Sequence, residues 1–221
     1  MTAGARAVWA VLPVKAFDAA KSRLAGALGP DERRALTRRL MLTALDALLA
    51  SRALAGVLVV SAEPEALALA RRRGAAALPE AAGGLNQALS LARRAAMARG
   101  AAALLVMPAD LPLVGGADVR GFLEAAAAAD VAIVPDRRRS GTNALLLRPP
   151  GAITFAFGEG SFERHLALAA AAGFEPRVVD VPAIAFDLDT ADDLADLRNL
   201  PYGLAAAGGL PVRPKGRGLT A

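Results

Sequence analysis

Short, uninterrupted apolar runs recur along this chain between longer amphipathic stretches, and they limit its fold more than any other pattern. They lie at Val8–Val14, Gly56–Val60, Ala103–Met107 and Val131–Pro135. A strand that is apolar at every position, instead of at alternate positions, has both of its faces covered. The pattern therefore predicts a single-domain α/β fold, a three-layer α/β/α sandwich in which helices cover both faces of a mostly parallel sheet.

The stretches between these runs have the features of helices. Pro30 occupies a first-turn position with acids beside it, and Thr190 can cap the helix that follows it. We expect helices at about 30–52, 63–73, 85–99, 118–128 and 161–171 and from 190 onward, with further strands at 75–78, 143–147 and 177–181. A length of 221 residues suits one domain, here 1–200, followed by a basic Gly/Pro-rich tail at 201–221 that we expect to be disordered.

The composition excludes several kinds of site. The chain has no Cys and a single His, His165, which excludes thiolate metal sites, a cysteine nucleophile and zinc sites built on two histidines. No apolar run approaches the ~18 residues of a membrane span. The first run contains Pro13 and is followed at once by Lys15, which argues against a signal peptide. We therefore expect a cytoplasmic protein with no membrane partner.

The net charge of +5 suggests a nucleic-acid partner only at first sight. Arg213, Lys215 and Arg217 lie in the tail, which has no acid, so the rest of the chain carries only +2. With one Trp and one Tyr, the chain also lacks aromatics that could alternate with bases and stack on nucleotides. We therefore expect no nucleic-acid partner.

Two of the three lysines and one arginine share the loop directly after the first apolar run. Lys15, Lys21 and Arg23 fall within nine residues, and ligands of doubly wound sheets bind outside the carboxyl ends of the strands. These cations could cradle a polyphosphate, or the loop could simply be solvated. Neither G-x-x-x-x-G-K-[ST] nor G-x-G-x-x-G occurs in the chain, so side-chain cations would have to hold any nucleotide.

Three aspartates are candidates for a magnesium site. Asp110 follows the third apolar run in a loop that prolines bracket and stiffen. Asp187 and Asp189 are two residues apart, so in an extended chain both project to the same side. Oxygen ligands suit Mg²⁺, which is often held by one or two carboxylates together with substrate phosphates. Alternatively, Asp189 helps to cap the helix that begins at Thr190.

A further group of residues suits a small anion. Gly158–Ser161 ends at a predicted helix N-terminus, where free backbone N–H groups and the helix dipole favour a phosphate or a carboxylate. Arg164 follows one turn later, and Thr142 lies in a second polar segment, Ser140–Asn143. Alternatively, the glycine segment is only a turn and a helix cap.

Three more features have both a structural and a functional interpretation. His165 lies in the same first turn, where a lone histidine is more often packed or capping than in contact with substrate. Arg137–Arg139 is a run of a kind that is usually solvated, although beside Thr142 it could form an anion-facing lid. Asn86 lies in the helix that Gly84 opens; its amide could read the edge of a base, or the segment is only a helix start.

In their order along the chain, these segments resemble the 2-phospho-L-lactate guanylyltransferase family. That family includes the phosphoenolpyruvate and 3-phosphoglycerate guanylyltransferases of deazaflavin coenzyme F420 biosynthesis. The resemblance spans about Val8 to Arg198. Its carriers are P-V-K from Pro13, A-K-S-R-L from Ala20, G-L-N-Q-A-L from Gly84, P-A-D-L-P from Pro108, G-T-N-A-L-L from Gly141, F-G-E-G-S-F from Phe157 with His165, and F-D-L-D-T from Phe186.

The resemblance implies a fold like that of nucleotide-diphospho-sugar transferases and a role for each candidate residue. It assigns the GTP phosphates to Lys15, Lys21 and Arg23, the surroundings of guanine to Gly84 and Asn86, Mg²⁺ to Asp110, Asp187 and Asp189, and the acceptor to Thr142, Gly158, Gly160 and Ser161. The three cations of the first loop and Asp110 would be the catalytic groups.

The implied reaction transfers GMP from GTP to a three-carbon phospho-acid of the 2-phospho-L-lactate type and releases pyrophosphate. Phosphoenolpyruvate and 3-phospho-D-glycerate are alternative acceptors, because all three acids carry a phosphate and a carboxylate on a three-carbon frame. The segment Arg137–Ser140 is more basic than the glycine-rich approach to G-T-N expected of the family, which leaves the acceptor open. The Ala-rich helices suggest a homodimer.

Two other functions stay open on the sequence. A sugar-phosphate or molybdopterin nucleotidyltransferase would share the sheet and the aspartates, but it should show a G-x-G-x-R loop after the first strand, which this chain lacks. A non-catalytic nucleotide-binding regulator would need no metal-binding aspartates.

Overall fold

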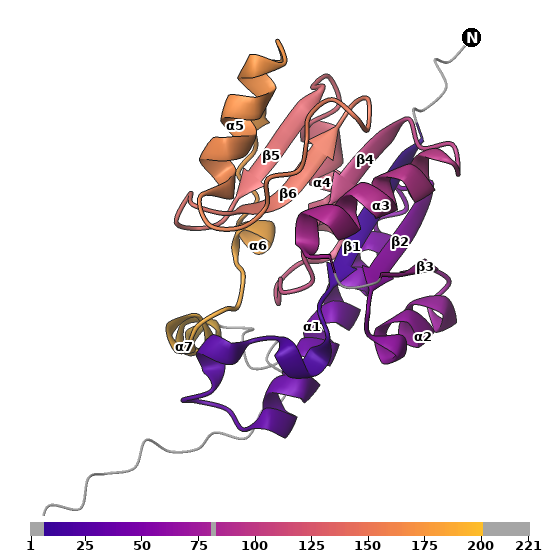
Figure 1. The fold of residues 1–221 in the computed structure, drawn as a ribbon. Helices are drawn as coiled ribbons and strands as arrows, with labels where there is room; N and C mark the ends of the chain where they lie inside the picture. Colours follow the sequence, from indigo (N-terminus) through magenta and orange to yellow (C-terminus); the bar gives the residue numbers. More distant parts are fainter. Residues whose placement is uncertain (1–6, 81–82, 201–221) are drawn as a thin grey trace, which may run out of the picture.

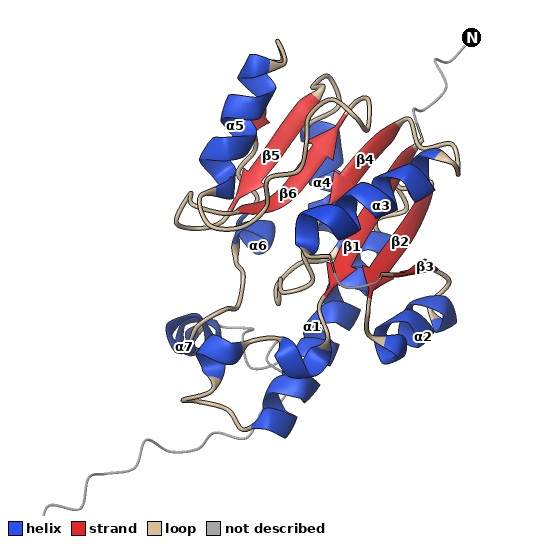
Figure 2. Cartoon of the chain, in the orientation of Figure 1, coloured by secondary structure: helices blue, strands red, loops and turns tan. Residues whose placement is uncertain are grey.

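The computed structural model describes residues 7–80 and 83–200, and the tail predicted at 201–221 lies outside them. The strands are β1 (Val8–Val14), β2 (Gly56–Ser61), β3 (Ala76–Pro79), β4 (Ala103–Val106), β5 (Val131–Pro135), β6 (Thr142–Leu147) and β7 (Arg177–Val178). They form one seven-stranded sheet in the order β3-β2-β1-β4-β6-β5-β7 (Figures 1 and 2). All pairs are parallel except the two that involve β6, which confirms the predicted α/β class and mostly parallel sheet.

The helices follow the predicted order, with additions in the loops. They are α1 (Pro30–Ala50), α2 (Pro64–Arg72), α3 (Leu85–Met97), α4 (Gly116–Ala125), α5 (Ser161–Ala171), α6 (Pro182–Ala185) and α7 (Ala191–Asn199), with two 3₁₀ turns, η1 (Phe17–Ala19) and η2 (Ser22–Leu24). No helix within 7–80 or 83–200 combines the length and the apolar character that crossing a membrane requires.

Two boundaries and one short helix differ from expectation. Helix α4 begins at Gly116 because the Asp118 carboxylate accepts a hydrogen bond from the Gly115 N–H at 2.9 Å and so caps the helix that it was expected to begin. The predicted strand at 177–181 is reduced to two residues. The short helix α6 then follows, with Pro182 in its first turn.

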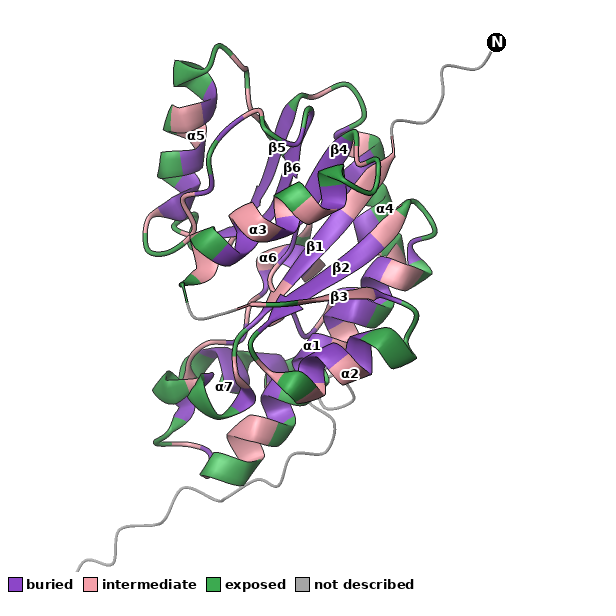
Figure 3. Cartoon of the chain, turned by 45° about the vertical axis from the view of Figure 1, so that its right-hand side comes forward, coloured by how far each residue is buried: buried purple, intermediate pink, exposed green. Residues whose placement is uncertain are grey.

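Helices cover both faces of the sheet and make two large apolar cores. Helices α1, α2, α4 and α6 pack on one face, where Leu12, Val59 and Leu105 belong to the same core. Helices α3 and α5 pack on the other face, against Val11 and Val106 among others. Buried residues therefore concentrate in the strands and on the inward sides of the helices (Figure 3).

A third, smaller core lies beside the sheet and joins segments from the two ends of the chain. It is built from Leu24 and Leu28 of the first loop, Leu36 and Leu40 of α1, and Phe186, Leu188, Leu194 and Leu197 around α7. Helix α7 accordingly lies next to the indigo N-terminal segments in Figure 1. This small core places the loop after β1 against the D-L-D segment before α7.

The antiparallel strand β6 starts at the end of the sheet where β1 and β4 finish. Strand β6 pairs with β4 so that Leu145 lies opposite Val106, and its first residue, Thr142, therefore lies where β4 ends. Strand β1 is parallel to β4, with Val11 opposite Val106, and ends at the same edge. The ends of β1 and β4 and the start of β6 thus lie side by side.

Candidate active site

The predicted site residues lie along this edge, at the point where the strand order reverses. The chain runs outward from β1 through β2 to β3 and then returns to the other side of β1 with β4. Crevices at such a switch point are the usual ligand sites of open α/β sheets. Lys15 follows β1 directly, Asp110 is the fourth residue after β4, and Thr142 begins β6.

The Lys21 ammonium lies between two of the three candidate aspartates. Its Nζ is 3.0 Å from Oδ2 of Asp110 and 2.8 Å from Oδ1 of Asp189, and its side chain is only 6% exposed. The backbone supports this arrangement, because the Leu188 N–H donates to the Asp110 carbonyl at 3.0 Å. Lys21 itself has a left-handed backbone, with φ 58° and ψ 35°, which directs η2 into the small core.

The electrostatics of this group follow from crowded carboxylates. Burial alone would lower the pKa of Lys21, but the charges of Asp110 and Asp189 outweigh burial and hold that pKa above its ordinary value. Burial raises the pKa of Asp187 from 3.8 to about 6, and repulsion from Asp110 and Asp189 adds to the rise. The site therefore holds more negative charge than one lysine neutralises.

The carboxylate oxygens are of the type that suits a magnesium ion, but the three aspartates are not gathered around one point. Within 7–80 and 83–200, no three His, Asp or Glu side chains lie close enough together to hold a metal ion. Two of the aspartates turn instead toward the Lys21 ammonium. Hard carboxylate oxygens, and an Asp187 whose charge is opposed by its neighbours, are the features that a divalent cation would relieve.

The other two cations of the first loop have no partner in the described part of the chain. Lys15 and Arg23 are exposed, and among residues 7–80 and 83–200 neither makes a hydrogen bond or an ion pair. The predicted cationic loop thus divides into one buried, paired lysine and two free charges.

Asp193, which the sequence reasoning missed, organises the turn that carries Asp189. Its carboxylate accepts hydrogen bonds from the backbone N–H groups of Asp189 and Thr190 at 3.1 and 2.8 Å and from the Thr190 hydroxyl at 2.8 Å. The Arg137 guanidinium pairs with the same carboxylate at 2.8 Å. The signal in the sequence was the spacing T-x-x-D of a capping box.

The Arg137–Arg139 run is neither simply solvated nor a free anion-facing lid. Arg137 also pairs with Asp196 at 3.0 Å and stacks over the Phe186 ring at 3.9 Å. Arg138 lies 3.3 Å from Asp193, and Arg139 lies 3.6 Å from Asp180. Each arginine therefore has an acidic partner; Arg137 and Arg138 connect the β5–β6 turn to α7, and Arg139 connects it to the segment after β7.

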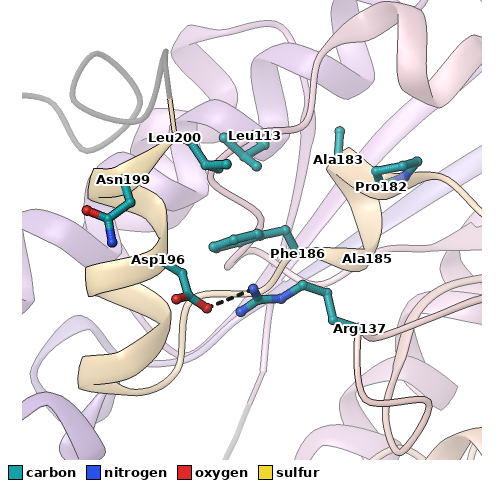
Figure 4. A pocket seen from close by; sticks show the side chains of 9 residues that line it. All are labelled: Leu113, Arg137, Pro182, Ala183, Ala185, Phe186, Asp196, Asn199 and Leu200. Atoms are coloured by element: carbon teal, nitrogen blue, oxygen red, sulfur yellow. Dashed lines mark hydrogen bonds and ion pairs between the residues drawn. The ribbon is translucent and has the colours of Figure 1, made fainter.

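A hollow of about 550 Å³ lies beside the ion pairs between Arg137 and α7 (Figure 4). Arg137, Phe186 and Asp196 line it together with Leu113, Leu200 and residues of α6, and Arg137 and Asp196 form an ion pair with each other (Figure 4). None of the residues assigned to GTP, Mg²⁺ or the acceptor lines it, so the hollow is separate from the candidate site.

The predicted anion-binding segment before α5 differs from expectation in one respect. The N–H groups of Ser161 and Phe162, at the helix start, are already bound to the carbonyls of Gly158 and Ser140 at 3.0 and 3.1 Å. Within the described residues, the N–H groups of Gly158, Glu159 and Gly160 donate no hydrogen bond. The free donors thus lie in the turn, where Gly158 and Gly160 have φ of 125° and 67° that favour glycine.

Ser161 is the first residue of α5 and not its cap, because Gly160 occupies the cap position. The residue is 2% exposed, and its hydroxyl has no hydrogen-bond partner among the described residues. No fully buried polar side-chain atom there lacks a partner, so the small exposed part of Ser161 includes its hydroxyl. Arg164, expected to assist with the anion, donates instead to the Ala156 carbonyl at 2.9 and 3.1 Å.

His165 and Asn86 both form hydrogen bonds with the backbone of the loop before α5. The His165 ring is fully buried, with Nδ1 at 3.0 Å from the Thr142 hydroxyl and Nε2 at 3.1 Å from the Ala156 N–H. The Asn86 amide exchanges two hydrogen bonds with the backbone of Phe157, at 3.1 and 2.9 Å. The Asn86 amide therefore binds the loop backbone. Gly84 is the N-cap of α3 and has a φ of 84°, which glycine permits.

The sequence matches a known protein family and individual relatives. Residues 8–199 match the family described as "Guanylyl transferase CofC like". The chain is 48% identical over 209 residues to a phosphoenolpyruvate guanylyltransferase of Rubrobacter xylanophilus, covering 94% of this chain and 98% of that one. It is 35% identical over 193 residues to a 2-phospho-L-lactate guanylyltransferase of Methanothermobacter thermautotrophicus, covering 85% and 82%.

Solved structures share the fold at low sequence identity. A Desulfovibrio desulfuricans protein described as a nucleotide-diphospho-sugar transferase superposes with a TM-score of 0.70 at 18% identity, covering 90% of this chain and 93% of that one. A nucleotidyl transferase of Methanothermobacter thermautotrophicus gives a TM-score of 0.64 at 16% identity, covering 90% and 98%. The predicted likeness to the nucleotide-diphospho-sugar transferase fold is confirmed.

Proposed function

Because the chain belongs to the CofC-like guanylyltransferase family, we propose that it transfers GMP from GTP to phosphoenolpyruvate and releases pyrophosphate. Two relatives at 48% and 47% identity bear that acceptor in their names, which is why it is placed first. The 2-phospho-L-lactate expected from the sequence is the competing acceptor, since a relative at 35% identity is named for it. Either product would serve deazaflavin coenzyme F420 biosynthesis.

One observation carries the proposal: a buried lysine and a crowded set of carboxylates lie at the switch point, and two nearby cations in the same loop have no partner among the described residues. A triphosphate needs cations along its length, whereas attack at its α-phosphorus brings two anions together. Both needs are met by charge and positioning, with no covalent intermediate on the protein.

The proposed reaction needs no general acid or base from the protein. An oxygen of the acceptor phosphate, already anionic near neutral pH, attacks the α-phosphorus of GTP. A new P–O bond forms as the bond from the α-phosphorus to the bridging oxygen of the β-phosphate breaks, and pyrophosphate leaves with that electron pair. The absence of cysteine and the scarcity of histidine are consistent with such a reaction.

Each side of the site has its own task in this proposal. Lys15 and Arg23 bind the β- and γ-phosphates, because they are free to turn toward a ligand. Asp110, Asp187 and Asp189 hold Mg²⁺, and Lys21 keeps two of them in place. When bound, that ion would offset the repulsion between the two anions and the charge of the leaving pyrophosphate. The N–H groups of 158–160 with the hydroxyls of Thr142 and Ser161 bind the acceptor.

The direct test is pyrophosphate release from GTP with each of the three acids in turn. We expect phosphoenolpyruvate to give the highest kcat/KM, and mass spectrometry to find a product that joins GMP to the acid. Glucose 1-phosphate in place of the acid, and ATP in place of GTP, are the controls. Turnover of glucose 1-phosphate but of none of the three acids would contradict the proposal and favour a sugar nucleotidyltransferase.

A further inference from the structure

The hydrogen bonds of His165 define which ring nitrogen carries its proton. A backbone N–H can only donate, so the Ala156 N–H at 3.1 Å requires a lone pair on Nε2. A neutral imidazole with an unprotonated Nε2 carries its hydrogen on Nδ1. That Nδ1 lies 3.0 Å from Oγ1 of Thr142, so the ring donates to the threonine oxygen.

The direction of this bond determines what the Thr142 hydroxyl can do. A hydroxyl that accepts from the ring retains its own hydrogen for another acceptor. Among the described residues, Thr142 Oγ1 has no second hydrogen-bond partner. Thr142 is also the first residue of β6, where β4 ends, so this hydroxyl belongs to a residue of the candidate site.

We infer that His165 is a positioning residue whose Nδ1–H, fixed by the Ala156 N–H on the opposite nitrogen, makes the Thr142 hydroxyl a committed donor to the anionic acceptor. This inference rests on the proposed function, because it assumes that the acid binds beside β6. In the opposite tautomer Nδ1 would accept the hydroxyl hydrogen and Nε2–H would face a second N–H. Thr142 would then present only lone pairs to a phosphate or carboxylate.

The surroundings keep the ring neutral and in place. The ring is fully buried, and burial lowers the pKa of His165 to about 4, with the positive charge of Arg164 acting in the same direction. The Phe157 ring packs edge-on against the imidazole at a centroid distance of 4.8 Å. Because Asn86 binds the Phe157 backbone, the histidine, the loop at 156–161 and the start of α3 form one connected unit.

The first test reads the tautomer without any substrate. His165 is the sole histidine of the chain, so untagged protein labelled with ¹⁵N-histidine gives one set of ring signals. A multiple-bond ¹H–¹⁵N spectrum should show a protonated Nδ1 and an unprotonated Nε2 throughout about pH 6–8. A protonated Nε2, or a doubly protonated ring in that range, would overturn the inference.

The second test separates the two hydrogen bonds of the ring. His165→Asn retains a donor near the position of Nδ1, whereas His165→Gln retains an acceptor near Nε2 and loses the donor to Thr142. We expect His165→Gln to raise the KM of the acid at least ~10-fold with the KM of GTP unchanged, and His165→Asn to raise it no more than ~3-fold. Equal acid KM values in the two variants would also overturn the inference.

Controls distinguish this inference from a loss of stability and from failure of the proposed function. Thr37→Val removes another buried threonine hydroxyl, which donates to the Arg33 carbonyl in α1, and should lower the melting temperature without a change in either KM. If wild-type protein turns over none of the three acids, the proposed function fails, while the histidine spectrum still decides the tautomer. If wild type is active but Nε2 is protonated, only the present inference fails.

Discussion

The two sides of the candidate site are prepared in opposite ways. On the side proposed to bind the GTP phosphates (the phosphate side), Lys15 and Arg23 are exposed and have no partner in the described chain. On the side proposed to bind the acceptor (the acceptor side), His165, Thr142 and Asn86 are hydrogen-bonded to one another or to the backbone of the loop at 156–161. A long, flexible polyanion can be held by mobile cations, whereas a small acid that must aim one oxygen at phosphorus needs donors fixed in advance.

The aspartates between the two sides should show the largest effect. Asp110→Asn, Asp187→Asn and Asp189→Asn should each lower kcat at least ~100-fold, because each change removes a hard anionic ligand from the proposed magnesium site. Circular dichroism should show that the fold is retained. Asp192→Asn, an exposed neighbour with no partner among the described residues, should behave as wild type.

If two of the three aspartate variants keep near-wild-type turnover at saturating Mg²⁺, the assignment of the metal to these residues is wrong.

The acceptor side should respond next. Ser161→Ala combined with Thr142→Val removes two hydroxyls that would bind a charged group, which costs about 1.5–3 kcal/mol each, or roughly ten- to a hundredfold per contact. The KM of the acid should rise far more than that of GTP, with both read from pyrophosphate release. A double variant that changes only the GTP KM would show that the two sides have been assigned to the wrong substrates.

The phosphate side should lose affinity without losing stability. Lys15→Ala removes a free charge from the proposed triphosphate site and should raise the KM of GTP about tenfold. Its melting temperature should match wild type, because Lys15 has no partner in the described chain. Lys215→Ala, outside the described residues, is the charge-matched control, and equal GTP affinity in the two variants would make the first loop merely solvated.

The smallest effect is a dependence of stability on pH. The pKa of Asp187 in the folded chain, about 6, lies above its ordinary 3.8, so the folded state binds this proton more tightly than the unfolded state does. The contribution of Asp187 to the free energy of unfolding therefore increases as pH falls from above 6 toward 4. As the pH falls through that window, we expect the melting temperature of wild type to rise relative to that of Asp187→Asn. A difference that stays constant with pH would contradict the raised pKa of Asp187.

The fold was largely accessible from sequence because its strands are continuous apolar runs. The antiparallel direction of β6 was not predicted, although the sequence contains a signal for it: only six residues separate Pro135 from Thr142, too few for the crossover that a parallel pair requires. Lys15, Asp110 and Thr142 could be placed at one edge because each adjoins a strand end. Local spacing thus carried most of the architecture and the position of the site.

The hydrogen-bond and ion-pair partners of the site side chains could not be predicted from the sequence. Asn86 was expected near a base, yet its amide is bound to Phe157, 71 positions away. Lys21 was expected on phosphate, yet it pairs with Asp110 and Asp189, 89 and 168 positions away. Such contacts depend on how distant segments meet in the folded chain, and no local pattern encodes them.

The small core between η2, α1 and α7 sets a condition on how the protein is made. Leu24 and Leu36 complete this core only with Phe186, Leu194 and Leu197. During synthesis from the N-terminus, all seven strands can leave the ribosome, through Val178, before either D-L-D or α7 has appeared. A chain that stops at Val178 would keep every strand of the sheet but would lack Asp187 and Asp189, two of the three residues proposed to hold Mg²⁺.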